Sequence, residues 1–263
     1  MAEIKQYGLL GYPLSHSFSK GYFTEKFRKE GIAAVYENFA LPSILEFPSL
    51  ILSSPQLVGL NVTIPYKQAV MTYLDALDPE AEAVGAVNVI RIERLVGQKP
   101  FLTGYNSDLV GFRESIRPLV STIGNLSLKA LVLGTGGASK AILYGLHQLG
   151  VESQLVSRRS APGQITYEDL TAAHYKDFRI IVNTTPLGMS PNIDTCPPLD
   201  YSLIDSGHLL FDAVYNPEKT LFLQKGEAQG ATIKNGLEML HLQAEAAWDI
   251  WNFKTHIFSD IVP

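Results

Sequence analysis

A glycine-rich turn between a short apolar strand and a helix constrains the fold of this chain more than any other feature. Residues 129–133 predict a strand, residues 138–149 a helix and residues 151–156 a second strand, with the motif GTGGAS at 134–139. Glycines permit a sharp turn and let backbone N–H groups approach a pyrophosphate, which the dipole at the helix N-terminus also attracts. Ser139 replaces the third glycine of the usual pattern and is small enough for close helix–strand packing. This order of elements favours a dinucleotide-binding unit over an ordinary tight turn.

The end of the second strand indicates which dinucleotide is bound. An NAD site usually carries an acidic residue there, which accepts a hydrogen bond from the ribose 2′-hydroxyl. Here Ser157 is followed by Arg158 and Arg159. Because guanidinium groups match a 2′-phosphate in charge and geometry, we favour NADP. A solvent-exposed pair of charges in a loop is the alternative.

The rest of the chain is typical of an α/β enzyme. Short β-branched runs alternate with helical patterns over 263 residues, and the pattern changes near residues 105–125. Such alternation predicts largely parallel sheets. The net charge is −5 with no block of Lys or Arg, so we expect no nucleic-acid partner. We find no run of about 18 apolar residues and no apolar signal segment, so we expect no membrane span and a cytoplasmic location.

The usage of cysteine and histidine argues against a disulfide or a metal site. Cys196 is the only cysteine, which rules out an internal disulfide and a multi-cysteine zinc site. The six histidines show no metal-ligand spacing, and His16 is interpreted as a local hydrogen-bonding residue. We therefore expect no metal.

One polar cluster in the first half follows the first predicted strand. In GYPLSHSFS, residues 11–19, three hydroxyls and an imidazole crowd the end of an apolar run. Either Ser19 caps the next helix, or Ser17 and Ser19 together hold a carboxylate. The residues alone leave these two interpretations equal.

A second polar cluster is NVTIPYK, residues 61–67. Asn61 and Thr63 alternate with apolar residues, so both side chains point to one face of a strand end. A helix is predicted to open near Pro65, which places Lys67 in its first turn. Because a cation there opposes the helix dipole, a functional lysine is favoured over a merely solvated one.

Three further polar residues stand at the ends or on the faces of predicted elements. Asn88 begins a strand, and Asp108 begins a helix, where a simple N-cap is the alternative role. Gln243 lies on the apolar stripe of the last helix, so it needs a hydrogen-bond partner. A substrate hydroxyl and a backbone carbonyl both remain open as that partner.

Taken together, these motifs resemble the shikimate dehydrogenase family, and they span nearly the whole chain in family order. The matching segments are GYPLSHSFS (11–19), NVTIPYK (61–67), GAVN (85–88), GYNSD (104–108), GTGGAS (134–139), NTTPLGM (183–189), DAVYNP (212–217) and GLEMLHLQA (236–244). The resemblance implies reversible NADP-dependent reduction of 3-dehydroshikimate to shikimate, in the pathway to chorismate and the aromatic amino acids.

The resemblance also implies a role for each matching residue. It makes Lys67 and Asp108 the catalytic pair at the reacting oxygen. The residues that it assigns to the substrate are Ser17, Ser19 and Tyr215 at the carboxylate, and Thr63, Asn88 and Gln243 at the ring hydroxyls. Those that it assigns to the cofactor are Gly134, Gly136, Gly137, Ala138 and Ser139 at the pyrophosphate, Ser157, Arg158 and Arg159 at the 2′-phosphate, Thr184 and Leu187 along the cofactor, and Gly236 and Met239 near the nicotinamide.

We therefore predict an α/β enzyme of two domains. An N-terminal α/β substrate domain comprises residues 1–107 and 238–263, because the C-terminal helix packs back on it, and residues 108–237 form a Rossmann-like NADP-binding domain. The active site is expected in the cleft between them, and the chain is expected to be a monomer or a homodimer. One alternative is a quinate/shikimate dehydrogenase with broader substrate and cofactor choice. The other is a catalytically silent nucleotide-binding regulatory module.

Overall fold

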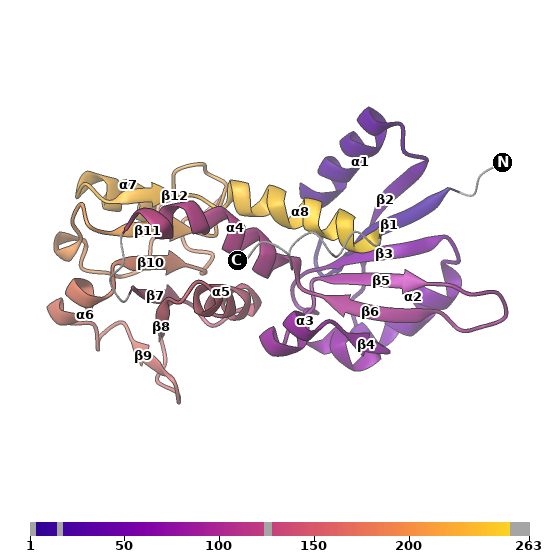
Figure 1. The fold of residues 1–263 in the computed structure, drawn as a ribbon, viewed down its shortest axis with the longest axis horizontal. Helices are drawn as coiled ribbons and strands as arrows, with labels where there is room; N and C mark the ends of the chain where they lie inside the picture. Colours follow the sequence, from indigo (N-terminus) through magenta and orange to yellow (C-terminus); the bar gives the residue numbers. More distant parts are fainter. Residues whose placement is uncertain (1–3, 15–17, 124–127, 253–263) are drawn as a thin grey trace. The chain divides into compact units, whose positions relative to one another are not determined.

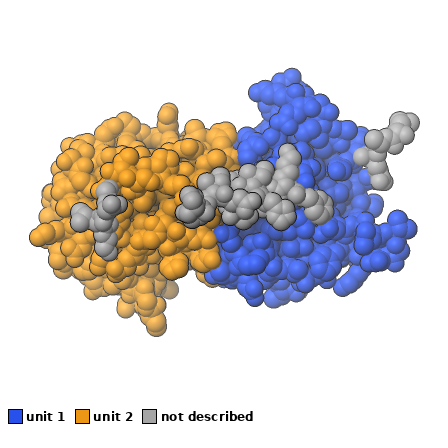
Figure 2. Space-filling model, viewed as in Figure 1, with its two compact units in different colours: residues 1–107, 244–263 blue, residues 108–243 orange. Residues whose placement is uncertain are grey.

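The computed structural model describes residues 4–14, 18–123 and 128–252, and it divides the chain into two compact units. Unit 1 comprises Met1–Ser107 and Ala244–Pro263, and unit 2 comprises Asp108–Gln243. Figure 2 colours unit 1 blue and unit 2 orange. No helix among the described residues is both long and apolar enough to cross a membrane.

Unit 1 is built on a six-stranded mixed sheet with the strand order β2-β1-β3-β5-β6-β4 (Figure 1). Its strands are β1 Lys5–Gly11, β2 Ala34–Ala40, β3 Leu57–Val62, β4 Ala76–Leu77, β5 Val89–Glu93 and β6 Phe101–Tyr105. The pairs β1–β2 and β1–β3 are parallel, whereas β3–β5 and β5–β6 are antiparallel. The carboxyl ends of β1, β2 and β3 therefore meet at one edge of the sheet.

Helices cover both faces of this sheet. One face carries α2, Phe47–Ser53, and α3, Pro79–Val84, whose apolar side chains join Leu10 and Leu60 in one core cluster. The other face carries α1, Phe18–Glu30, and the end of α8, Leu237–Trp251. The Trp251 Nε1–H donates to the Ile90 carbonyl at 3.1 Å, so the C-terminal helix packs back on the first sheet as predicted.

The prediction of a helix that opens near Pro65 is wrong. Residues 65–68 form turns, and only a short 3-10 helix follows, η2 Ala69–Tyr73. The Tyr66 N–H bonds to the Thr63 carbonyl, and the Lys67 carbonyl accepts the distant Val87 N–H at 2.7 Å. These turn and tertiary bonds replace a regular helical start. Lys67 consequently lies in no α-helical first turn, and the dipole argument for its function does not hold.

Unit 2 contains a six-stranded sheet in which every pair is parallel, with the order β12-β11-β10-β7-β8-β9. Its strands are β7 Lys129–Leu133, β8 Glu152–Ser157, β9 Gln164–Thr166, β10 Ile180–Asn183, β11 Leu209–Asp212 and β12 Thr232–Lys234. The chain starts at β7, adds β8 and β9 on one side, and then returns to add β10 to β12 on the other. This is the doubly wound order of a Rossmann-like domain, with its switch point between β7 and β10.

Helices lie on both faces of this second sheet, as a doubly wound fold requires. One face carries α4 Ser107–Thr122, α5 Gly137–Gln148 and the start of α8. The other carries α6 Ala172–Asp177 and α7 Leu221–Ala228. The prediction of an α/β fold with a Rossmann-like second domain is confirmed.

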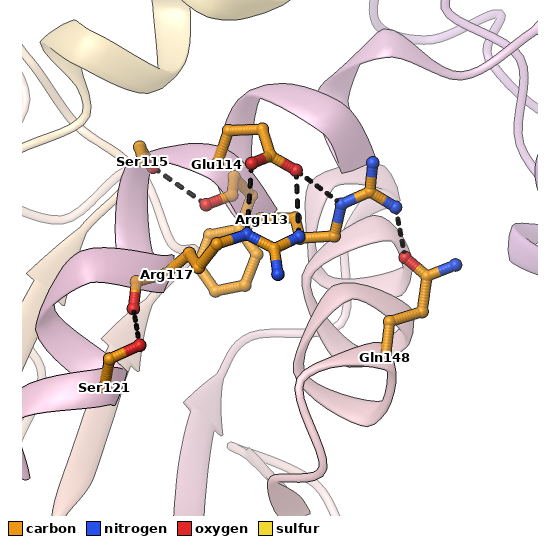
Figure 3. Close-up of polar contacts among 7 residues, drawn as sticks. Arg113, Glu114, Ser115, Arg117, Ser121 and Gln148 are labelled. Atoms are coloured by element: carbon orange, nitrogen blue, oxygen red, sulfur yellow. Dashed lines mark hydrogen bonds and ion pairs between the residues drawn. The ribbon is translucent and has the colours of Figure 1, made fainter. Parts of the chain in front are cut away.

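A polar cluster fixes α4 against the end of α5 (Figure 3). The Arg113 guanidinium, on a residue only 9% exposed, donates to Gln148 Oε1 at 2.6 Å and to Glu114 Oε1 at 2.8 Å. Glu114 also accepts two hydrogen bonds from Arg117. A buried guanidinium requires such partners, since leaving it unpaired would be strongly destabilising.

Candidate active site

The turn after β7 requires glycine at Gly134. Its φ of 108° is a conformation that L side chains rarely adopt, and a Cβ there would lie 2.8 Å from Thr184 Oγ1. The Gly134 N–H donates to the Val156 carbonyl, and the Thr184 hydroxyl donates to the Leu133 carbonyl at 2.7 Å. The glycine turn and Thr184 therefore meet at the switch point between β7 and β10, where ligands bind in doubly wound folds.

The N-terminus of α5 is open to a ligand. Gly136 is its exposed N-cap and provides no side-chain cap, and a Cβ there would meet no atom within 4 Å. Gly137 and Ala138 form the partly exposed first turn of the helix. The Ser139 side chain is buried and donates to the Gly136 carbonyl at 2.6 Å, so it holds the turn in shape. Uncapped N–H groups at a helix start are suited to a pyrophosphate.

The carboxyl end of β8 carries cations and no acid. Arg158 and Arg159 are both exposed, and neither guanidinium pairs with a carboxylate among the described residues. The Ser157 hydroxyl accepts the Arg159 N–H at 3.4 Å, and the positive charge of Arg158 acts on the nearby Tyr167 hydroxyl. These residues fit a cofactor that carries a 2′-phosphate, because two unpaired guanidinium groups attract an anion.

A buried polar network that sequence reasoning missed lies at the carboxyl ends of β10 and β11. Asp212, fully buried, accepts hydrogen bonds from Asn183 Nδ2 at 3.0 Å, the Val214 N–H at 3.0 Å and the Thr220 hydroxyl at 2.5 Å. Asn183 Oδ1 in turn accepts the N–H and the hydroxyl of Thr185. The signal was present in the sequence, since Asn183 and Asp212 each end an apolar strand.

This network fixes two loops that carry predicted site residues. The Thr185 hydroxyl accepts the Leu187 N–H at 3.3 Å, so the loop with Thr184 and Leu187 is tied to the strand ends. The Val214 and Thr220 bonds hold the segment that contains Tyr215, which is 38% exposed. Burial raises the pKa of Asp212 to about 6 from its ordinary 3.8, although its three hydrogen bonds oppose that shift.

Gly236 and Met239 lie at the start of α8, close to the end of β11. The Gly236 N–H donates to the Val214 carbonyl at 3.2 Å, and a Cβ on Gly236 would collide with the Ala213 backbone. Met239 is 8% exposed and belongs to the core cluster that includes Phe211. Glycine is needed here for close backbone approach, which brings α8 against the β11 end.

In unit 1, backbone hydrogen bonds bring Thr63, Lys67 and Asn88 together. The Val62 N–H donates to the Asn88 carbonyl at 2.8 Å, and the Val87 N–H donates to the Lys67 carbonyl at 2.7 Å. Thr63 follows β3 directly and donates its N–H to the Leu10 carbonyl. Three predicted site residues that are up to 25 positions apart in the sequence thus share the carboxyl edge of the first sheet.

Asn88 also fixes the start of the helix that carries Asp108. Its Nδ2 donates to the Ser107 hydroxyl at 3.0 Å, and its Oδ1 accepts the Ser107 N–H at 2.6 Å. Asp108 follows Ser107 within α4 and is only 5% exposed. Asp108 is therefore the second residue of the helix, so the N-cap interpretation is not what the structure shows.

Gln243 lies in unit 2, on the part of α8 that crosses α4. A Cβ on Gly111 of α4 would lie 3.0 Å from both the Gln243 Cβ and the Gln243 N. Gly111 therefore permits a close crossing of the two helices, which fixes the backbone position of Gln243. Its side chain is half-buried and has a hydrogen-bond or contact partner, as the apolar stripe required.

Ser19 lies in the first turn of α1 and is half-buried. The predicted residues Ser17 and His16 lie outside the described residues. Among the residues that the structure does describe, no group of three His, Cys, Asp or Glu side chains could hold a metal ion. Unit 1 thus contributes hydroxyl, amide and amine groups, and unit 2 contributes a carboxylate and a dinucleotide turn.

The doubly wound order of unit 2, its glycine turn and the cations after β8 define the class of dinucleotide-dependent oxidoreductases with a separate substrate-binding unit. Residues 9–90 match the family model of the shikimate dehydrogenase substrate binding domain. The NADP(+) shikimate dehydrogenase of Caldanaerobacter subterraneus subsp. tengcongensis is 34% identical over 263 residues, which cover 94% of this chain and 91% of that protein. The chain belongs to the shikimate dehydrogenase family.

Two solved structures illustrate the range of this similarity. Shikimate 5-dehydrogenase from Thermus thermophilus, in complex with NADP(H) and shikimate, has a TM-score of 0.80 at 28% identity, over 95% of this chain and 94% of that chain. Quinate dehydrogenase from Corynebacterium glutamicum, in complex with NAD, has a TM-score of 0.81 at 25% identity, over 95% and 94%. Because the fold is common to both activities, substrate and cofactor choice must be argued from individual residues.

Proposed function

We propose that this chain catalyses the reversible NADP-dependent reduction of 3-dehydroshikimate to shikimate. The observation that carries the proposal is the joining of Thr63, Lys67 and Asn88 at one sheet edge, in a chain that belongs to this family. Their hydroxyl, amine and amide groups suit a small polyhydroxylated ring. We place the reaction in the cytoplasm, since a single cysteine fits a reducing compartment.

The cofactor is held by the glycine turn and by the arginines after β8. The N-terminus of α5, from Gly136 to Ser139, receives the pyrophosphate, and Arg158 with Arg159 receives the 2′-phosphate. Thr184 and Leu187 line the cofactor, and Gly236 with Met239 lies by its nicotinamide. When NADPH is bound, its nicotinamide supplies the hydride that reduces the substrate carbonyl.

The chain itself binds the substrate and manages the proton. Hydride addition leaves a negative charge on the carbonyl oxygen, which must take up one proton. We assign that proton delivery to the Lys67 ammonium, with the Asp108 carboxylate orienting the amine. Thr63, Asn88 and Gln243 hold the ring hydroxyls, and Ser17, Ser19 and Tyr215 hold the carboxylate. These contacts fix the ring so that its ketone faces the proton donor.

A four-way assay tests the proposal. Shikimate and quinate are each offered with NADP and with NAD, to the wild type and to Lys67→Ala. Lys99→Ala is the matched control, because Lys99 is an exposed lysine of the same unit whose ammonium pairs with Asp75. We expect turnover of shikimate with NADP, a loss of about 10²–10⁴-fold in Lys67→Ala and no change in the control.

The assay also separates the two alternatives. Equal turnover of quinate with NAD would establish the broader quinate/shikimate enzyme. The quinate dehydrogenase of Corynebacterium glutamicum has a similar fold. Tight NADP binding without turnover of either substrate would establish a silent binding module. The arginines after β8 and the presence of both Lys67 and Asp108 favour the NADP-dependent shikimate enzyme over each of them.

A further inference from the structure

The loop that carries Arg158 and Arg159 is unusually short for the strands that it joins. It connects β8 to β9 through residues 158–163, and the two strands pair in parallel, with Leu155 opposite Gln164. A crossover between neighbouring parallel strands usually takes a dozen or more residues. A loop this short must fold back tightly, so its shape depends on the hydrogen bonds made within it.

Gln164, the first residue of β9, makes two of the bonds that hold this loop. Its backbone N–H donates to the Ala161 carbonyl at 3.2 Å, and its side-chain Nε2 donates to the Arg159 carbonyl at 2.8 Å. The Ser157 hydroxyl accepts the Arg159 N–H at the longer distance of 3.4 Å. The backbone of Arg159 is therefore held at its N–H and at its carbonyl, and the bond from Gln164 is the shorter of the two.

The Arg159 carbonyl determines what kind of side chain can make this contact. A backbone carbonyl only accepts hydrogen bonds, so the NH2 end of the Gln164 amide must face it. Methionine has a similar length but no N–H to donate, and an ionised glutamate has none either. The amide nitrogen, and not the length of the side chain, therefore carries the contact.

We propose that Gln164 is a positioning residue for the 2′-phosphate of the cofactor, acting through Arg159. The inference rests on the proposed function, in which Arg158 and Arg159 receive that phosphate. A guanidinium binds a phosphate best through two parallel hydrogen bonds, which require a defined position of the group. Because Arg159 is exposed, binding must order its long side chain, and a backbone that is already held lowers the entropy cost of that step.

The same bond bears on the choice between NADP and NAD. NAD carries a hydroxyl where NADP carries the 2′-phosphate, so a change confined to the arginine loop should weaken NADP and spare NAD. A general structural loss in unit 2 would weaken both cofactors alike, because both would use the glycine turn after β7. The ratio of the two affinities thus separates a positioning role from a merely structural one.

Gln224 provides a matched control in the same unit. On α7, its Nε2 donates to the Lys219 carbonyl at 3.0 Å, five residues earlier in the chain, just as Gln164 donates to Arg159. Both bonds lie at the surface and join a glutamine amide to a loop carbonyl. Gln224→Met therefore removes the same kind of bond without touching the loop that carries the arginines.

The test is calorimetric titration of NADP and of NAD into the full chain. The variants are Gln164→Met, Gln224→Met, Arg159→Ala and the double variant of Gln164→Met with Arg159→Ala. We expect Gln164→Met to raise the Kd of NADP about 3- to 10-fold and to leave the Kd of NAD within about 2-fold. Gln224→Met should change neither Kd. In the Arg159→Ala background, Gln164→Met should add nothing, because residues that act through one another are not additive.

Several results would overturn the inference while leaving the proposed function intact. One is an unchanged Kd of NADP in a folded Gln164→Met, and another is an equal loss for NADP and NAD. A loss of full size in the Arg159→Ala background would likewise refute action through Arg159. A wild type that binds NADP no more tightly than NAD would instead refute the proposed cofactor, and this inference with it. Thermal unfolding of each variant confirms that it is folded.

Discussion

The buried charge of Asp212 predicts that replacing it by asparagine improves stability at neutral pH and removes a pH dependence. Asp212→Asn keeps the shape of the side chain and an oxygen that accepts from Asn183 and the Val214 N–H. What it removes is an ionised carboxyl whose pKa burial raises to about 6 from 3.8. The folded chain therefore holds this proton up to a higher pH than the unfolded chain does.

The sign and size of the effect follow from proton linkage. Between about pH 6 and 3.8 the folded state binds more protons, so Asp212 adds stability as the pH falls through this window. The difference between a pKa of 3.8 in the unfolded chain and about 6 in the folded chain costs ~3 kcal/mol of stability at high pH, and lowering the pH from about 8 to 4.5 recovers ~2 kcal/mol of that stability. Asp212→Asn has no carboxyl to titrate at this position, so its stability does not carry this pH dependence. The free energy of unfolding of the variant minus that of the wild type should therefore be ~2 kcal/mol larger at pH 8 than at pH 4.5.

Urea unfolding of both proteins at each pH measures this difference, and other titrating groups cancel in the comparison. If the free-energy difference between variant and wild type is the same at about pH 8 and 4.5, the account of a buried, destabilised Asp212 charge is refuted. The kcat of the variant is a second readout, because the network also holds the loop with Leu187.

Three further predictions concern unit 2. Gly134→Ala forces a φ of 108° on a side chain that meets Thr184, so thermal unfolding should show a loss of about 1–3 kcal/mol and the NADP KM should rise; an unaltered KM would argue against a cofactor at this turn. Replacing Arg158 and Arg159 together by alanine should lower the kcat/KM ratio of NADP to NAD about 10- to 100-fold, and a constant ratio would remove them from the 2′-phosphate site. Arg113→Ala removes the guanidinium that joins Glu114 on α4 to Gln148 on α5, so urea unfolding should show a loss of about 1–3 kcal/mol with kcat unchanged, and a stability equal to the wild type would contradict the clamp between α4 and α5.

The local elements around the glycine turn could be predicted from the sequence because their signals are local. The strand at 129–133 has the predicted bounds, α5 begins one residue earlier than expected, and β8 begins one residue later. Capping is equally local, since the Asp78 side chain caps the start of α3 and Gly85 ends it with a φ of 67°. Short-range chemistry decides each of these features.

What the sequence did not predict depends on contacts between distant segments. The helix from Pro65 does not form because the Lys67 carbonyl bonds to Val87, twenty residues further along the chain. The bridge from Tyr36 to Asn61 and the pair of Asn183 with Asp212 each need the strand order, which periodicity does not reveal. The role of individual site residues likewise came from the family resemblance, and it stays a prediction until variants are measured.

The most direct test of the central claim is to follow both reaction partners in the reducing direction. Purified chain is given NADPH and 3-dehydroshikimate, the loss of NADPH is followed by its absorbance, and the product is identified by NMR. The account predicts one shikimate formed for each NADPH oxidised, and almost no product in Lys67→Ala. NADPH that is stable in the presence of wild-type protein and 3-dehydroshikimate, or that is consumed without formation of shikimate, would contradict it.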